Sequence, residues 1–257
     1  MPSAIDVDSG GDVGDWRIAA VTRLAQDLPA AYPGGPSHKS GTAVYQASLV
    51  KTKQGELISF TTPSAVALAL NLAIRASQEA ARLYSDISYR EVLTPDGMGR
   101  SVEGATSHVL YDFFEQCMLS AVFSFQALEA FCNQIILREL KEAVEVKRRD
   151  KRVVLPPIEL ERQLSTSEKL ALIIPKARKL PTPKGKAVWE PFKRLQEARD
   201  ATVHLKARDQ YSADQDSLFF QFLSHKAAEF PKAAAEMIRY FYPVKDSWPR
   251  WLHRLPV

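Results

Sequence analysis

An arginine, which can bind anions, and a histidine, which can transfer protons, stand close together in this chain. They are Arg199 and His204, and Asp200 directly follows the arginine. A guanidinium presents planar donors that match carboxylate and phosphate oxygens, and an imidazole changes its charge near neutral pH. Asp200 and His204 are four residues apart, so on a helix they share a face and can form a hydrogen bond. This is the constellation whose spacing suits chemistry.

The stretch that carries these residues, 187–208, is predicted to form one amphipathic helix. Its apolar residues recur at steps of three and four: Val188, Phe192, Leu195, Ala198, Thr202 and Leu205. Arg199 lies one turn beyond Leu195 on this stripe. Burying a charged side chain is costly unless it is paired or lines a cleft. Arg199 is therefore predicted either to pair with another group or to line a cleft.

The rest of the chain is predicted to be mainly helical, with a small β-hairpin before the helices. Residues 165–168 have the spacing of a capping box, and the helix that they start is expected to end at Pro175. The predicted helices cover residues 16–28, 64–89, 107–145, 165–174, 187–208 and 213–241; the hairpin strands cover 42–50 and 56–62, and residues 95–99 and 146–157 are a turn and a charged connector.

The composition is that of a soluble globular protein, with 46% hydrophobic and 25% charged residues in a chain of 257. No apolar run reaches the roughly 18–20 residues that a membrane helix needs. The N-terminus lacks the basic-then-apolar pattern of a signal peptide. We therefore expect a cytoplasmic protein without a membrane segment.

No metal or cofactor is expected. The five histidines stand far apart, without neighbouring ligand pairs. The sequence has no phosphate-binding glycine loop, no GxSxG and no HExxH pattern. Cys117 and Cys132 both fall inside an apolar helical pattern, which predicts buried core residues and not a disulfide or metal pair.

A basic segment leads into the helix that carries Arg199. Seven basic residues and one acid lie between Pro175 and Leu195. Such a patch can attract a polyanion. It can also be the solvated linker of a mildly basic protein, whose net charge is +4. Both interpretations stay open on charge alone.

The succession of segments around this motif resembles the HEPN superfamily, whose helical bundles carry an Arg-x(4–6)-His motif. A helix with FQALEAFCNQII (125–136) is followed by a short helix with SEKLALI (167–173), and then by the helix in which four residues separate Arg199 from His204. The resemblance covers roughly residues 105–240. The residue after the arginine is Asp200, where the family more often has asparagine.

The resemblance implies a metal-independent endoribonuclease of the toxin or antiviral-defence kind, acting as a homodimer. In that family the RNA 2′-hydroxyl attacks the adjacent phosphate and leaves a cyclic phosphate end. By resemblance, His204 is the general acid or base, Arg199 binds the scissile phosphate, and Asp200 orients the imidazole. An antitoxin or a defence-system protein is the implied partner.

Helix geometry favours a site shared between two copies of the chain. Five residues on an ideal helix put Arg199 and His204 about 140° apart. The two side chains therefore do not easily converge on one phosphate from a straight helix. Two copies that face each other across a two-fold axis solve this, as does a local bend or an arginine that curves over its own stem.

Further candidates surround the motif. Glu129 and Asn133, four residues apart on the edge of the central apolar stripe, are predicted to pair with Arg199 when no RNA is bound. For Glu129, a solvated helix edge is the alternative. The candidate RNA-binding residues, each with a core or solvated surface position as its alternative, are Trp189, Lys193, Arg194 and Lys206.

The sequence thus predicts three parts: a flexible N-terminus with a short helix and the hairpin in residues 1–62, an HEPN-like helical bundle in 63–242, and a tail in 243–257. Two alternatives to the ribonuclease stay open. One is a catalytically inactive HEPN-like module that binds nucleotide, RNA or a protein. The other is a helical interaction protein whose hairpin offers an edge to partner strands.

Overall fold

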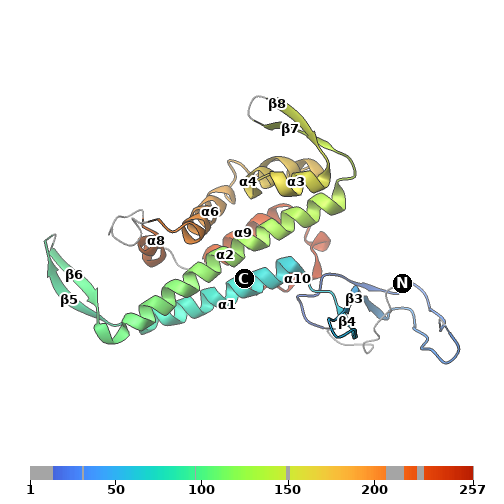
Figure 1. Ribbon diagram of the computed structural model, residues 1–257, viewed down its shortest axis with the longest axis horizontal. Helices are drawn as coiled ribbons and strands as arrows, with labels where there is room; N and C mark the ends of the chain where they lie inside the picture. The colour runs from blue at the N-terminus through green and yellow to red at the C-terminus, as the bar shows by residue number, and fades with distance from the viewer. Residues whose placement is uncertain are drawn as a thin grey trace. The chain divides into compact units, whose positions relative to one another are not determined.

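The computed structural model describes residues 14–30, 32–95, 97–148, 151–206, 217–224 and 229–256. Within them the protein is mainly α-helical, as predicted (Figure 1). The chain forms two compact units. The first combines Met1–Leu68 with Val244–Pro256, and the second spans Ala69–Pro243. The C-terminal segment that we predicted as a separate tail thus groups with the N-terminal residues.

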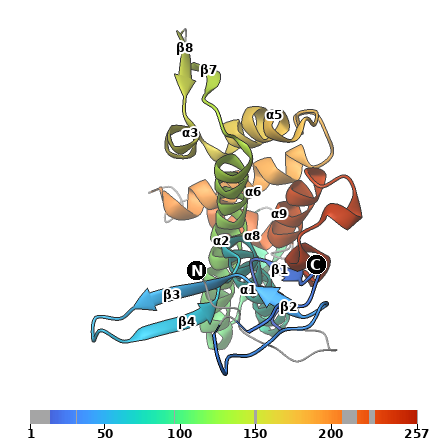
Figure 2. The same cartoon turned by 90° about the vertical axis from the view of Figure 1, so that its right-hand side faces the viewer.

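The first unit contains two antiparallel strand pairs, visible as ribbons in Figure 2. The expected hairpin is present, but the helix predicted over 16–28 is wrong. Val21 lies opposite Tyr45 in a strand pair, and Ile18 and Tyr45 are buried in a small core; this pairing overrides the helical spacing of the apolar residues. The pairs are β1 (Val21–Arg23) with β2 (Ala43–Tyr45), and β3 (Ala47–Lys51) with β4 (Leu57–Thr61).

The C-terminal part of the first unit forms two short helices, η3 (Lys245–Ser247) and α10 (Arg250–His253). Trp251 is buried. The guanidinium of Arg250 donates to the carbonyl oxygens of Gly14 and Asp15, at 3.2 and 3.4 Å. Hydrogen bonds therefore tie the two ends of the described chain together within this unit.

The second unit is organised around α2 (Ser107–Glu139), which packs against α6 (Trp189–Val203) and α9 (Glu229–Tyr240). α1 (Ala65–Asp86) precedes it, and its Tyr84 ring lies 5.3 Å from that of Phe113 on α2. Cys117 and Cys132 are buried in α2 and carry free thiols, as predicted. The predicted central helix is present and ends at Glu139, earlier than expected.

Two antiparallel hairpins flank α2, and the short helices of the unit follow the second hairpin. The segment 146–157, predicted to be a connector, is the second of these hairpins. The elements are β5 (Tyr89–Thr94), β6 (Gly97–Val102), η1 (Gly104–Thr106), β7 (Val144–Arg148), β8 (Lys151–Leu155), α3 (Pro157–Gln163), α4 (Thr166–Glu168), η2 (Lys169–Ile173), α5 (Ile174–Arg178) and α8 (Leu218–Ser224).

The predicted capping box is confirmed at the start of α4. Glu168 donates its backbone N–H to Ser165 Oγ at 3.2 Å, and Ser165 donates its own N–H to Glu168 Oε2 at 2.8 Å. The chain then continues through η2, a π-helical turn, into α5, so the prediction that this helix ends at Pro175 is wrong: a proline is tolerated in the first turn of α5. Among the described residues, no helix has the length and the apolar character that crossing a membrane requires.

Candidate functional site

The helix α6 positions the predicted motif, but it is shorter than predicted. Its residues Phe192, Leu195 and Ala198 are buried, which confirms the middle of the predicted apolar stripe, whereas Leu205 at the end of that stripe is exposed. The helix ends at Val203, so the prediction of one helix over 187–208 is wrong at its C-terminal end. His204 lies outside it, at φ −122° and ψ 59°, and donates its backbone N–H to the carbonyl oxygen of Asp200 at 2.9 Å.

Arg199 is half-buried between a ring and a carboxylate. Its Cζ lies 3.8 Å from the centroid of the Phe125 ring on α2. Its Nη1 lies 2.9 Å from Asp200 Oδ1, and the two side chains are 27% and 47% exposed. Phe125 is itself fixed, because it is buried and stacks on Phe192 with 6.3 Å between ring centroids. The free-energy cost of burying the charge of Arg199 is thus offset by a cation–π contact and an ion pair.

His204 is exposed and follows directly on the helix that holds Arg199. In the part of the chain that the structure describes, no hydrogen bond joins its imidazole to the Asp200 carboxylate, which faces Arg199 instead. The angle of about 140° between Arg199 and His204 assumed one straight helix through both residues. Because the helix ends between them, that angle no longer bears on whether one copy or two complete the site.

Among the described contacts, neither Glu129 nor Asn133 is paired with Arg199. Asn133 Oδ1 instead accepts a hydrogen bond from Lys169 Nζ at 2.8 Å. Glu129 lies exposed on α2, one turn before Asn133. This is the solvated helix edge that the sequence left open as the alternative for Glu129. The carboxylate that pairs with Arg199 is the one next to it in sequence, Asp200.

Trp189 and Lys193 both belong to the packing of α6. The half-buried Trp189 ring lies 5.1 Å from that of Phe192. Lys193 Nζ donates to Gln196 Oε1 at 2.8 Å, and Ser167 Oγ donates to the same oxygen at 2.8 Å. The bond from Ser167 joins α4 to α6, and the ammonium of Lys193 has a partner on its own helix.

Arg194 and Lys206 are both exposed. Arg194 lines a cavity of about 390 Å³ between α6 and α9. The other charged residues of this cavity are Glu229, Lys232 and Glu236, so acids and bases balance there. This mixed environment does not distinguish Arg194 as an RNA contact.

A buried lysine escaped the sequence-based prediction. Lys169 is 1% exposed, and its Nζ donates to Asn133 Oδ1 at 2.8 Å and to the carbonyl oxygen of Glu161 at 2.7 Å. It opens the π-helical turn η2, a kind of turn that is rare in helices. The available signal was a single lysine in the otherwise apolar run KLALI. Its contacts tie α3 and η2 to α2.

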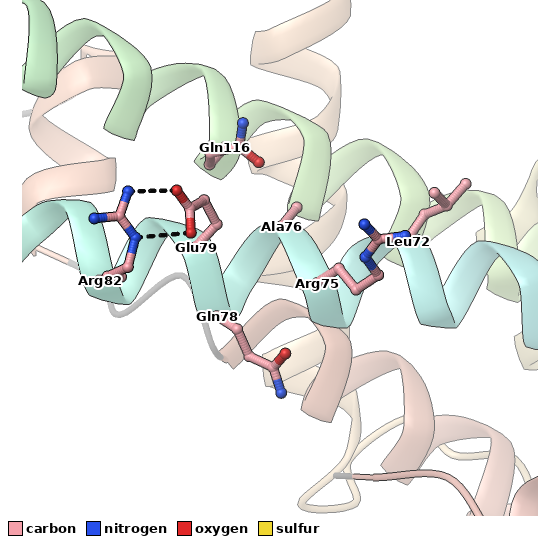
Figure 3. Close-up of a pocket in the computed structure, with 7 residues that line it drawn as sticks. All are labelled: Leu72, Arg75, Ala76, Gln78, Glu79, Arg82 and Gln116. Atoms are coloured by element: carbon pink, nitrogen blue, oxygen red, sulfur yellow. Dashed lines mark hydrogen bonds and ion pairs between the residues drawn. The ribbon is translucent and has the colours of Figure 1, made fainter.

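A larger hollow, of about 610 Å³, lies over α1 and α2 and contains none of the predicted site residues (Figure 3). Arg82 donates to both carboxylate oxygens of Glu79, at 3.0 and 2.6 Å, and to Asp86 Oδ2 at 2.8 Å. These acids satisfy its guanidinium. The lining residues are Leu72, Arg75, Ala76, Gln78, Glu79, Arg82 and Gln116.

Among the described residues, no group of three or more histidine, cysteine, aspartate or glutamate side chains could hold a metal ion. Comparisons with family models, with curated proteins and with solved structures found no match. The function is therefore argued from the contacts of Arg199, Asp200 and His204.

Proposed function

We propose that the helical unit is an HEPN-like bundle and that the protein is a metal-independent endoribonuclease of the toxin or antiviral-defence type. The observation that carries this proposal is the placement of Arg199. A ring beneath it and a carboxylate beside it hold its guanidinium near the end of α6, and the exposed imidazole of His204 follows at once. A fixed anion-binding group next to a group that transfers protons is what cleavage of a phosphodiester requires.

The proposed reaction needs a base, an acid and a cation. The RNA 2′-oxygen attacks phosphorus while its proton passes to a base, and the bond from phosphorus to the 5′-oxygen breaks as that oxygen takes a proton from an acid. The products are a 2′,3′-cyclic phosphate and a 5′-hydroxyl. Arg199 binds the non-bridging oxygens and stabilises the negative charge that grows on them. In a homodimer, the two copies of His204 supply the base and the acid.

Asp200 has a role before and after RNA binds. In the free protein its carboxylate holds the guanidinium of Arg199. When a scissile phosphate takes over the guanidinium, the carboxylate is released four residues before His204 in the sequence. It then orients the imidazole and favours its protonated form. This exchange of partners reconciles the observed ion pair with the role implied by the motif.

The packing of Arg199 also supports a second candidate function. Its contacts with Phe125 and Asp200 satisfy the guanidinium without any ligand. An arginine of this kind can serve the fold alone. The second candidate is therefore a catalytically inactive HEPN-like module that binds RNA, nucleotide or a protein partner.

Cleavage of RNA in excess chelator by the wild-type protein and by His204→Ala tests the proposal. We expect the wild type to leave cyclic phosphate ends and the folded variant to lose at least about a hundredfold in rate, in line with the contribution of a general acid or base. His108→Ala removes another exposed histidine of the same unit and should cleave like the wild type. If the folded wild type cuts no RNA in the assay, the second candidate replaces the first.

A further inference from the structure

The β7–β8 hairpin has a strongly basic end. From Lys147 to Arg152 the sequence has five basic residues and one acid. The hairpin continues beyond the C-terminal end of α2, where both views show it as a projecting two-stranded ribbon (Figures 1 and 2). Its base is anchored by the buried side chains of Val144, Val146 and Leu155. The anchored base and the basic end are thus distinct parts of one hairpin.

The register of the hairpin places basic residues opposite one another. Lys147 is paired with Arg152, and the next pair toward the turn is Arg148 with Lys151. Lys147, Lys151 and Arg152 are all exposed. Like charges directly opposite each other destabilise a strand pair, whereas opposite charges stabilise it. The sequence of this hairpin therefore works against its own stability.

The acid that pairs with Arg152 among the described residues, Glu145, offsets little of the repulsion. Glu145 Oε1 lies 3.2 Å from Arg152 Nη1, with side chains 54% and 79% exposed. Ion pairs at such exposure contribute little to stability, because water screens them. Lysines also protect strand edges from aggregation, but alternating acids and bases would protect the edge and stabilise the hairpin as well. Edge protection alone does not explain like charges in consecutive pairs.

We propose that the basic end of the β7–β8 hairpin is an arm that binds the phosphodiester backbone of RNA. The inference rests on the proposed function for the choice of RNA as the polyanion. A row of phosphates is the partner whose charge complements this end, and binding it relieves the repulsion between the opposed residues and releases counterions from the nucleic acid. A local arrangement that costs stability in the free protein thus contributes to binding.

The test measures how salt weakens binding. The probe is a fluorescent 2′-O-methyl RNA, which lacks the attacking hydroxyl and cannot be cleaved, used as a single strand and annealed to its complement. Lys147→Ala with Lys151→Ala removes one charge from each opposed pair. For the single strand, each lost phosphate contact lowers the slope of log K against log salt by about 0.7. We expect the slope to fall by about 1.4 and affinity at 50 mM salt to fall several-fold.

A matched control comes from another hairpin of the same chain. Lys51 and Lys53 lie exposed at the turn end of β3–β4. Lys51→Ala with Lys53→Ala removes the same net charge, so it corrects for long-range attraction between the protein and the probe. We expect this control to bind with nearly the wild-type slope. The probe form whose slope changes more identifies whether the arm contacts single-stranded or duplex RNA.

Thermal stability separates binding from a structural role. Lys147→Glu with Lys151→Glu places a carboxylate opposite each arginine, so we expect an unchanged or higher melting temperature together with a larger loss of affinity than the alanine pair shows. If the two lysines served the fold alone, the glutamate variant would have a lower melting temperature and the affinity of the wild type. Equal slopes for the wild type and both hairpin variants, with either probe form, would overturn the inference. Because the probe cannot be cleaved, this result is independent of whether Arg199 and His204 are catalytic.

Discussion

Replacement of Arg199 by alanine distinguishes its proposed catalytic role from a structural one. The change removes the ion pair with Asp200 and the contact with the Phe125 ring. An ion pair between side chains 27% and 47% exposed is worth at most about 1 kcal/mol, and a partly exposed cation–π contact contributes about 0.5–1 kcal/mol. The expected loss of about 1–2 kcal/mol leaves a domain with about 5–15 kcal/mol of stability folded.

The expected effect of Arg199→Ala on cleavage is larger. A donor aimed at the charge that develops in a transition state is worth about 3–4 kcal/mol, or a factor of about 10²–10³ in rate. A stability loss of about 1–2 kcal/mol leaves almost all of the protein folded, so unfolding accounts for almost none of this fall in cleavage rate. Single-turnover cleavage of a labelled RNA and the melting temperature of the same sample measure the two effects together. Arg199→Lys keeps the charge without the planar fork, and should fall between the wild type and alanine.

The matched control for this experiment is Arg75→Ala, which removes an exposed arginine from α1 in the same unit. It should cleave at the wild-type rate. The reasoning is refuted if folded Arg199→Ala protein cleaves within about threefold of the wild type, because a rate change that small corresponds to less than about 1 kcal/mol. A rate that falls only in proportion to the folded fraction would support the structural role instead.

Two further predictions concern the core of the helical unit. Lys169→Met keeps the aliphatic stem but leaves two acceptors on the half-buried residues Asn133 and Glu161 without their donor. We expect a loss of about 2–4 kcal/mol in urea unfolding, smaller in an Asn133→Ala background; strictly additive losses would contradict the contact. Burial raises the pKa of the Cys117 thiol to about 12 and raises that of Cys132 as well. Both thiols therefore stay protonated as the pH rises from 7 to 10, and their contribution to stability, present below about pH 8.5, is lost above it as thiols of the unfolded chain ionise. Iodoacetamide should label them slowly in the native protein and fast in urea, and fast native labelling at pH 8 would contradict their burial.

Local signals predicted the parts of the fold in which the chain satisfies its own groups. The capping box of Ser165 and Glu168 could be predicted because both hydrogen bonds join residues three apart in sequence. The apolar stripe of α2, with Cys117 and Cys132 in it, could be predicted because helical periodicity alone decides which face is buried. Neither prediction needed a distant partner.

Elements that depend on distant residues or on weak stop signals were not predictable. The apolar spacing around Val21 fits a helix, but the residues opposite it in β2 make it a strand. The sequence around Val203 and His204 contains neither glycine nor proline, so no stop signal marks the end of the helix at this point. The segment Lys147–Arg152 has no glycine or asparagine, so its charges predict a connector and not a hairpin.

The two proposed RNA contacts lie near different parts of one helix, α2, and this makes their roles separable. Phe125, under Arg199, and Glu139, the last residue of α2, are fourteen residues apart, or about 21 Å along the helix. The hairpin begins beyond that end, at Val144. A stacked strand advances about 3.4 Å per nucleotide, so about 21 Å corresponds to about six stacked nucleotides between the two proposed contacts. Substitutions in the hairpin and at Arg199 should therefore add in free energy, the first through affinity and its salt dependence, and the second through the rate of the bound complex.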